Sequence, residues 1–576
     1  MTKLMKYATP YVAHILFAIA LLFGQAYCDL SLPDYMSDII NKGIATGNMG
    51  VIMSVGGKML TVSLLSALCS VLVSLIAAIV AAGMCRTLRL NLFQKIETFS
   101  NAEFDKFSTS SLITRTTNDI TQVQTLIVMM IRMVFYAPIL GVGGVIRALS
   151  KSKSMSWIIA LAVFLLMLLV LYMFVVAMPK FRIVQGMIDR LNRIVRENLE
   201  GMLVIRAFST QKFEEKRFDE ANQDLTNLNL FINRVMSFMV PTMMLIMNLT
   251  TVLIVWVGSW QVSALHLQVG DMLAYMQYVM QIIMAFLMMA MMFILIPRAS
   301  VSAERIVDVM DTEPTIVNPE NPKVPEPCRG LVRFEHVSFR YPSAEEEVLH
   351  DIDFTASPGQ TTAFIGSTGS GKSTVVNLIP RFYDPTDGRV TIDGVDIREF
   401  DVHALRRQIG YVPQKGILFS GTIQSNLAYA DPDTATQEEM DAAAEIAQAT
   451  EFIESKPDGF ATEIAQGGTN VSGGQKQRLS IARALVKKPQ IYIFDDSFSA
   501  LDFKTDAKLR AALREKIGWA TTLIVGQRIS SIMNADQIIV LDGGRIAGKG
   551  THRELMESCE VYRQIAMSQL SKEELA

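Results

Sequence analysis

The sequence predicts an α-helical transmembrane domain, with six spans and long cytoplasmic extensions, followed by an α/β P-loop nucleotide-binding domain. Two observations predict this order. Half of the 576 residues are hydrophobic and only 19% are charged, and the apolar surplus lies almost entirely before residue 300. A complete phosphate-binding loop lies after it, at residues 366–373. We expect the membrane domain over 1–310, a linker over 311–330 and the nucleotide-binding domain over 331–576.

Six apolar stretches are each near the ~20 residues that a helix needs to cross a lipid bilayer. They lie at about 11–32, 58–84, 124–148, 155–178, 235–260 and 272–297. The first stretch is long and lacks the small-residue cleavage site of a signal peptide, so we interpret it as a retained helix.

The distribution of lysine and arginine between the loops predicts the orientation of these spans in the membrane. The segments 85–123 and 179–234 are rich in basic residues, whereas the segment 261–271 carries none. Because basic loops stay in the cytoplasm, we expect a multi-pass protein of the cytoplasmic (inner) membrane with its nucleotide-binding domain in the cytoplasm. The net charge of −3 provides no basic field, which argues against nucleic acid as a partner.

A phosphate site is predicted where a strand-like run, 361–365, leads into a G-x-x-x-x-G-K-S loop that opens a helix. In such a loop backbone N–H groups converge on the phosphates, Lys372 reaches the β- and γ-phosphates, and the Ser373 hydroxyl binds Mg²⁺. Asp495 ends a second strand-like run and is placed to hold the same Mg²⁺. The predicted nucleotide-binding residues here are Gly366, Ser367, Thr368, Gly369, Ser370, Gly371, Lys372, Ser373 and Thr374.

A further motif, Ser472-Gly-Gly-Gln475, is followed by Lys-Gln-Arg-Leu-Ser-Ile-Ala-Arg. It resembles the signature of ATP-binding cassette (ABC) proteins, and with six spans ahead of one nucleotide domain the chain resembles an exporter-type half-transporter. The resemblance implies ATP and Mg²⁺ as cofactors and an ATPase coupled to transport. It also implies three more site residues: Tyr341 stacks on adenine, Gln414 belongs to the Q-loop and contacts the metal, and Asp502 belongs to the D-loop.

In this family two nucleotide domains face each other head to tail, and ATP is held between one P-loop and the other domain's signature. Ser472, Gly473 and Gly474 open a predicted helix, where N–H groups can cap a γ-phosphate outside their own P-loop, and Gln475 completes the motif. A partner domain is therefore required.

Two positions depart from the family pattern. The residue after the Walker-B acid is ordinarily Glu, the general base, but here it is Asp496, and Gln527 stands where a switch histidine is usual. A carboxylate withdrawn by one methylene, together with a side chain that cannot carry a proton, predicts slow hydrolysis at this chain's own site. The pattern resembles the degenerate-site subunit of bacterial heterodimeric multidrug exporters, which predicts a second, non-identical half-transporter as partner. The alternative is a homodimer with two slow but working sites.

The substrate is less well defined. Methionines are abundant in the fifth and sixth predicted spans and suit a surface that accepts several apolar shapes, although they also suit plain packing. We favour export of hydrophobic or amphipathic small molecules; a lipid or peptide exporter and a nucleotide-gated regulatory or channel subunit are the alternatives. Arg132 and Asn248 are polar within spans, which suggests inward-facing roles. The segments 103–118 and 205–216 are expected to transmit the closure of the nucleotide domains to the spans.

Overall fold

The computed structural model describes residues 2–325, 327–342 and 344–569. Its contacts divide the chain into two compact units, of which the first comprises residues 1–97 with 110–312 and the second comprises 98–109 with 313–576. Residues 98–109 therefore differ from the expected boundary, because their side chains pack in the second unit. The two units are described separately.

The first unit consists of helices. They are η1 (Thr2–Tyr11), α1 (Val12–Asp38), η2 (Ile39–Ile44), α2 (Met49–Glu97), α4 (Thr109–Thr114), η3 (Arg115–Asp119), α5 (Ile120–Met129), η4 (Met130–Val134), α6 (Phe135–Lys151), α7 (Ser156–Glu200), α8 (Met202–Ala207), α9 (Gln211–Ser263) and α10 (Val269–Asp311).

Six helical segments of the described chain are long and apolar enough to cross a membrane, which confirms the predicted spans. They are Lys3–Ile44, Met49–Glu97, Thr109–Lys151, Ser156–Met173, Gln211–Ser263 and Val269–Met292. The helices also confirm the predicted extensions, because the 53 residues of α9 span about 80 Å against a hydrocarbon core of about 30 Å.

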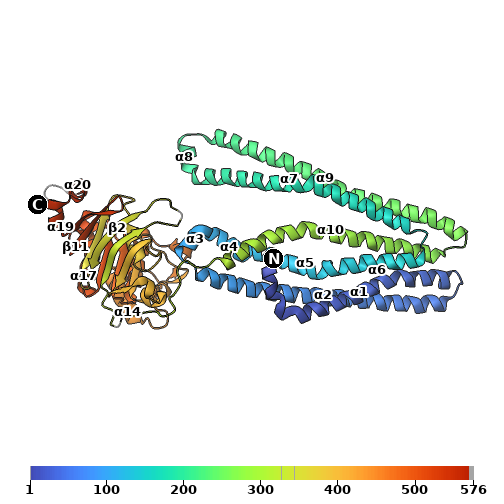
Figure 1. Ribbon diagram of the computed structural model, residues 1–576, viewed down its shortest axis with the longest axis horizontal. Helices are drawn as coiled ribbons and strands as arrows, with labels where there is room; N and C mark the ends of the chain where they lie inside the picture. The colour runs from blue at the N-terminus through green and yellow to red at the C-terminus, as the bar shows by residue number, and fades with distance from the viewer. Residues whose placement is uncertain (1, 326, 343, 570–576) are drawn as a thin grey trace. The chain divides into compact units, whose positions relative to one another are not determined.

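The helices α7 and α9 form a long hairpin, and α8 joins them at one end (Figure 1). At that end the hairpin lies apart from α2, α5 and α10, whereas at the other end the helices converge. No residue of α8 is buried, and Leu203 and Phe208 are 82% and 75% exposed. Among the described residues, the apolar side chains of this segment therefore remain largely exposed within its own unit.

The third span departs from regular α-helical geometry twice, at the π-helical turns η3 and η4. Each π turn inserts a residue into the helix and shifts the face that follows it. Arg132 lies in η4 and is exposed in the single chain, as is Asn248 on α9.

The second unit is an α/β domain with three sheets. Its strands are β1 (Val332–Phe339), β2 (Leu349–Ala356), β3 (Thr361–Gly366), β4 (Asp387–Ile392), β5 (Val395–Asp396), β6 (Ile409–Val412), β7 (Gly421–Thr422), β8 (Glu463–Ile464), β9 (Ile491–Asp495), β10 (Thr521–Val525), β11 (Gln537–Asp542) and β12 (Arg545–Gly550). The largest sheet has the order β12-β11-β3-β10-β9-β6, and an antiparallel sheet has the order β2-β1-β4-β5.

The second unit also contains the following helices: α3 (Asn101–Phe107), α11 (Lys372–Leu378), η5 (Ile397–Glu399), α12 (Val402–Arg407), α13 (Ile423–Ala428), α14 (Gln437–Ile446), α15 (Thr450–Glu454), η6 (Gly459–Ala461), η7 (Gln466–Gly468), α16 (Gly473–Val486), α17 (Phe503–Lys516), α18 (Ile529–Ile532), α19 (His552–Ser558) and α20 (Glu560–Gln569). Successive residues of β3 enter different cores, since Phe364 packs in one cluster and Ile365 in the other, as the alternation of a strand requires.

Candidate functional site

The site residues gather at one edge of the largest sheet. The strands β3, β10, β9 and β6 are parallel neighbours in that order, so their carboxyl ends meet. Lys372 follows β3, Gln527 follows β10, Asp496 follows β9 and Gln414 follows β6. Ligands bind at this edge in open α/β sheets, because the loops after several strands converge there.

The P-loop lies between β3 and α11. Gly369 and Gly371 have φ angles of +84° and +93°, a backbone region that side-chain-bearing residues rarely adopt, and a Cβ on Gly371 would lie 2.6 Å from Leu349 Cδ2. The Lys372 Nζ donates to the carbonyl oxygens of Gly366, at 2.9 Å, and of Ser367, at 2.7 Å. Burial lowers the pKa of Lys372 against the opposing charges of Asp496 and Asp495. The loop thus holds an ammonium group beside backbone amides, as a polyphosphate requires.

A pair of oxygen ligands lies next to the P-loop. The Ser373 Oγ donates to Asp495 Oδ1 at 2.8 Å, and only 5% of Asp495 is exposed. Burial raises the pKa of Asp495, and the neighbouring Asp496 charge adds to the rise. A hydroxyl and a carboxylate in contact are hard oxygen donors that fit Mg²⁺, with phosphate oxygens and water completing the shell. The described residues contain no cluster of three His, Cys, Asp or Glu side chains that would hold a metal alone.

The base and switch positions are in direct contact. The Oδ2 atom of Asp496 accepts hydrogen bonds from Gln527 Nε2, at 2.7 Å, and from Gln414 Nε2, at 3.0 Å. Asp496 is 7% exposed and has a φ of +47°, which Asp tolerates better than most residues. Burial raises its pKa, partly offset by the hydrogen bonds from Gln414 and Ser499. One carboxylate oxygen is therefore committed to two neutral amide donors.

Tyr341 lies at the side of the P-loop. Its hydroxyl forms a hydrogen bond of 3.0 Å with Thr374 Oγ1, and its ring packs edge-on against Tyr383 with centroids 5.2 Å apart. The Tyr383 hydroxyl in turn donates to Asp105 Oδ2 on α3 at 3.1 Å. The aromatic residue expected to carry adenine is thus linked to a helix from the 98–109 segment.

In the part of the chain that the structure describes, the side chains of the signature and of Asp502 form their hydrogen bonds within their own segments and not with the P-loop. Ser472 caps α16 and forms a reciprocal capping box with Gln475, while Asp502 caps α17 by accepting from the backbone N–H of Thr505 at 3.0 Å. A Cβ on Gly474 would lie 3.2 Å from the Ala500 carbonyl oxygen, so the signature adjoins the D-loop. Ser472 and Gly473 are exposed and present the amino end of α16 outward.

Three residues that support the site were not predicted. Gln477 donates to the Pro413 carbonyl and accepts from the Gly416 N–H, both at 3.0 Å, which fixes the loop that carries Gln414. Gln569 donates to the Gln527 carbonyl at 2.8 Å and accepts from the Ile529 N–H at 2.8 Å. Tyr383 is the third. Gln477 lies two residues after the signature motif, and this position could have marked it as a supporting residue. Nothing in the sequence links Gln569 to residue 527.

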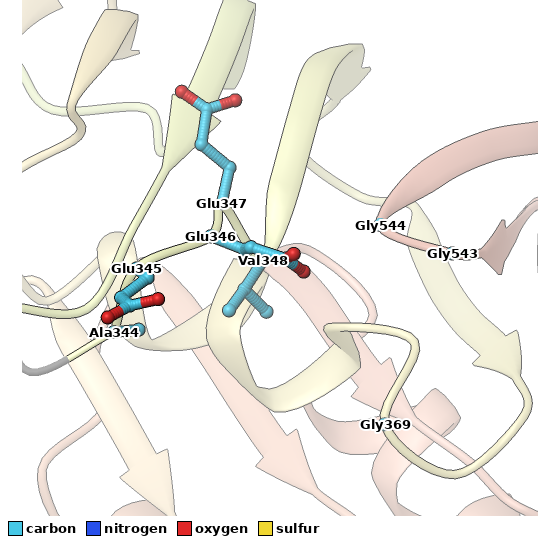
Figure 2. A pocket seen from close by; sticks show the side chains of 8 residues that line it. All are labelled: Ala344, Glu345, Glu346, Glu347, Val348, Gly369, Gly543 and Gly544. Carbon is cyan, nitrogen blue, oxygen red and sulfur yellow. The ribbon is translucent and has the colours of Figure 1, made fainter.

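An acidic depression adjoins the outer side of the P-loop. Figure 2 shows Gly369 in its loop and the side chains of the neighbouring acidic turn. The lining residues are Ala344, Glu345, Glu346, Glu347, Val348, Gly369, Gly543 and Gly544. Because this lining has three carboxylates and no basic side chain, it does not suit a polyphosphate. A polyphosphate is therefore better accommodated on the Lys372 side of the loop.

Comparisons with known proteins agree with this geometry. Residues 15–286 match the family model described as the ABC transporter transmembrane region, and residues 349–499 match the model described as ABC transporter. An uncharacterized ABC transporter ATP-binding protein of Mycobacterium tuberculosis is 42% identical over 569 residues, covering 98% of this chain and 97% of that protein.

Two further likenesses cover nearly the whole chain. The ATP-dependent lipid A-core flippase of Pseudomonas aeruginosa is 30% identical over 580 residues, covering 98% of this chain and 95% of that protein. The solved structure of a bacterial Atm1-family ABC exporter with ATP bound superimposes with a TM-score of 0.78 at 25% identity, covering 97% of this chain and 98% of the other. These likenesses confirm a helical transmembrane domain followed by an ABC nucleotide-binding domain.

Proposed function

Because the chain belongs to the ABC transporter family and is an ATP-driven exporter, we propose that it works as one subunit of an asymmetric heterodimer. In this proposal its own P-loop site binds ATP with Mg²⁺ and hydrolyses it slowly, while its signature completes a competent site on a different half-transporter. The exported substrates are hydrophobic or amphipathic small molecules, and the membrane is the cytoplasmic (inner) membrane.

The observation that carries the proposal is the contact between Asp496 and Gln527. A general base needs an oxygen that reaches the attacking water, and Asp is shorter than Glu by one C–C bond of about 1.5 Å. Gln527 and Gln414 both donate to Oδ2 of Asp496 and so fix the orientation of the shorter carboxylate. Gln527 cannot accept a proton as imidazole does. Together the two positions forfeit much of the ~10²–10⁴-fold that a well-placed base contributes.

The binding side of the site supports retention of ATP. Lys372 and the loop amides would bind the phosphates, and Ser373, Asp495 and the Gln414 amide oxygen would hold Mg²⁺, which neutralises phosphate charge when bound. Exposure of Ser472 and Gly473 supports donation of the signature to a partner, since the start of α16 is open to a phosphate that another chain brings.

In the proposed cycle, ATP binding joins two nucleotide domains, and their closure switches the spans from inward- to outward-facing. Hydrolysis at the competent site then resets the transporter. The expected transmitting segments are 103–118 and 205–216. Methionines in the described parts of α9 and α10 support a cavity that accommodates several apolar shapes.

A second candidate is a homodimeric lipid exporter. The observation that favours it is the 30% identity with the lipid A-core flippase of P. aeruginosa. In that case both copies of the Asp496 site would have to support turnover.

Purified subunits distinguish these candidates. We expect little ATPase activity from the full-length chain alone in lipid nanodiscs, and strong activity when it is co-purified with a half-transporter encoded beside it. Robust ATPase from this chain alone, abolished by Asp496→Ala, would eliminate the heterodimer.

A further inference from the structure

Three acidic side chains lie toward the same end of the membrane unit, on two helices that pack together. Asp29 and Asp34 belong to α1, and Asp271 belongs to the first turn of α10. Asp29 is 17 residues beyond Val12, about 26 Å along α1, and falls within the first predicted span. An ionisable side chain within a span is costly even three residues before the end of the span, so its partner matters.

Two of these acids are neutralised by basic residues. Asp34 pairs with Arg147 at 3.0 Å and with Lys151 at 3.1 Å, and Lys151 also pairs with Asp271 at 2.9 Å. The network thus contains two carboxylates and two cations. It joins α1, α6 and α10 without leaving a net charge.

Asp29 has a different environment. Its Oδ1 accepts from the Ser66 hydroxyl at 2.6 Å, and its Oδ2 accepts from the Tyr136 hydroxyl at 2.5 Å. The Gln281 amide donates to the Asp29 backbone carbonyl at 3.1 Å. Within the described chain, no lysine, arginine or histidine forms an ion pair with Asp29. Hydroxyl groups orient this carboxylate but do not neutralise it.

The hydrogen-bond pattern suits an ionised carboxylate. Both oxygens act as acceptors, as a charged carboxylate does, and each retains lone-pair capacity for one more donor. Asp29 is partly exposed in the single chain, which leaves part of its surface available to a further donor. A cation that brings its own apolar body into the membrane would supply the missing charge at a lower desolvation cost than a hydrated ion.

We propose that Asp29 is the anionic recognition site for amphipathic organic monocations, held in place by Ser66 and Tyr136. This inference rests on the proposed function, because it names the charge class of the small molecules that the exporter accepts. It makes the negative charge of Asp29 a determinant of specificity, whereas Asp34 and Asp271 join helices.

Equilibrium binding without ATP tests the proposal. The full-length chain, alone and co-purified with its partner, is placed in nanodiscs and titrated with rhodamine 6G, a fluorescent monocation, and with Nile red, a neutral amphiphile. The readout is the affinity for rhodamine 6G divided by the affinity for Nile red. Asp29→Asn should lower this ratio about tenfold or more, since a hydrogen bond to a charged group is lost, and Asp29→Glu should restore most of it.

Asp38→Asn is the matched control. It removes a carboxylate from the same helix, one that pairs with Lys42 and does not contact Asp29, so the affinity ratio should stay that of the unmodified chain. If Asp29→Asn and Asp38→Asn lower the ratio alike, the effect does not depend on the site of Asp29 and the proposal is overturned. An unchanged ratio in Asp29→Asn overturns it as well, as does a Glu variant that folds but restores nothing.

This result is separate from that of the ATPase experiment. A chain that hydrolyses ATP strongly by itself would defeat the heterodimer and leave the cation preference standing. An equal affinity ratio in the unmodified chain and in Asp29→Asn would defeat the cation site and leave the heterodimer standing.

Discussion

The residues that would bind the nucleotide and the residues that would cleave it differ in how well their arrangement suits these two tasks. On the binding side, the Lys372 ammonium, the positive-φ glycines and the Ser373–Asp495 pair are arranged as phosphate and Mg²⁺ binding require. On the hydrolytic side, Asp496 is held by two amides and faces no imidazole. The contrast indicates that the residues for binding and for cleavage can vary separately, even where Asp495 and Asp496 are neighbours at the end of β9.

The largest expected effect is a loss of ATP affinity when the binding side is mutated. Lys372→Ala removes the ammonium that reaches the phosphates and should weaken ATP binding to this chain on the order of 100-fold, because several charge-assisted hydrogen bonds are lost. Titration with a fluorescent ATP analogue measures the effect. Lys488→Ala, which loses only the exposed ion pair with Glu439, is the control and should bind normally. Equal binding by both variants would show that the loop is not the ATP site.

The next effect is a gain in ATP turnover when the usual residues are restored on the hydrolytic side. The double change Asp496→Glu with Gln527→His should raise turnover at this chain's site by about 10²-fold, within the range that a positioned base contributes. The rate is measured by single-turnover ATP hydrolysis in a complex whose other site has been inactivated. Since residue 496 has a φ of +47°, the Glu is also expected to lower the melting temperature. No gain in turnover would mean that another feature limits this site.

A smaller effect tests the signature. Ser472→Ala removes the capping oxygen of α16 and one hydroxyl aimed outward, and should lower the ATPase rate of the complex about tenfold, comparable to the loss of one charge-assisted hydrogen bond. ATP binding to this chain's own P-loop should not change, because the Ser472 side chain bonds with Gln475 of its own helix. Thr551→Ala, which removes a similar cap from α19, serves as the control. A loss of ATP binding at the chain's own P-loop would contradict the assignment of the signature to a partner's site.

The smallest effect concerns stability. Because burial raises the pKa of Asp495, the folded chain favours the protonated carboxyl; its contribution to stability is complete at low pH and is lost as pH rises through the raised pKa. Asp495→Asn should therefore raise the melting temperature by roughly 2–4 °C at neutral pH and not at acid pH. It should also remove the Mg²⁺ dependence of ATP binding. Calorimetry at two pH values measures the first effect, and equal shifts at both would refute the explanation.

The second unit was predictable where short segments carry their own chemistry. The P-loop is contiguous, so a strand, a glycine-rich loop and a helix follow from the local sequence alone. Asp496 and Gln527 could each be identified as unusual, yet their hydrogen bond depends on β10 lying beside β9. Gln569 was not predictable, because α20 reaches the switch loop from the end of the described chain.

In the membrane unit, hydropathy predicted the number of spans, but it could not predict the π-helical turns of the third span or the pairing between spans. The spans are largely apolar, and their mean composition does not predict which of their polar residues form contacts with one another. Asp34 and Asp271 are separated by hundreds of residues and meet through Lys151, whereas the carboxylate of Asp29 accepts hydrogen bonds from the hydroxyl groups of Ser66 and Tyr136.

By itself the sequence determined the order of the two domains, the six apolar spans and the residues of the P-loop and signature, because these features depend on local composition and on the spacing of neighbouring residues. Only the tertiary structure decided which residues meet: Asp496 with Gln527 and Gln414, α3 with the second unit, and Asp29 with Ser66 and Tyr136. The physical reason is that hydrogen bonds and charge neutralisation act over a few ångströms in space, whatever the distance along the chain.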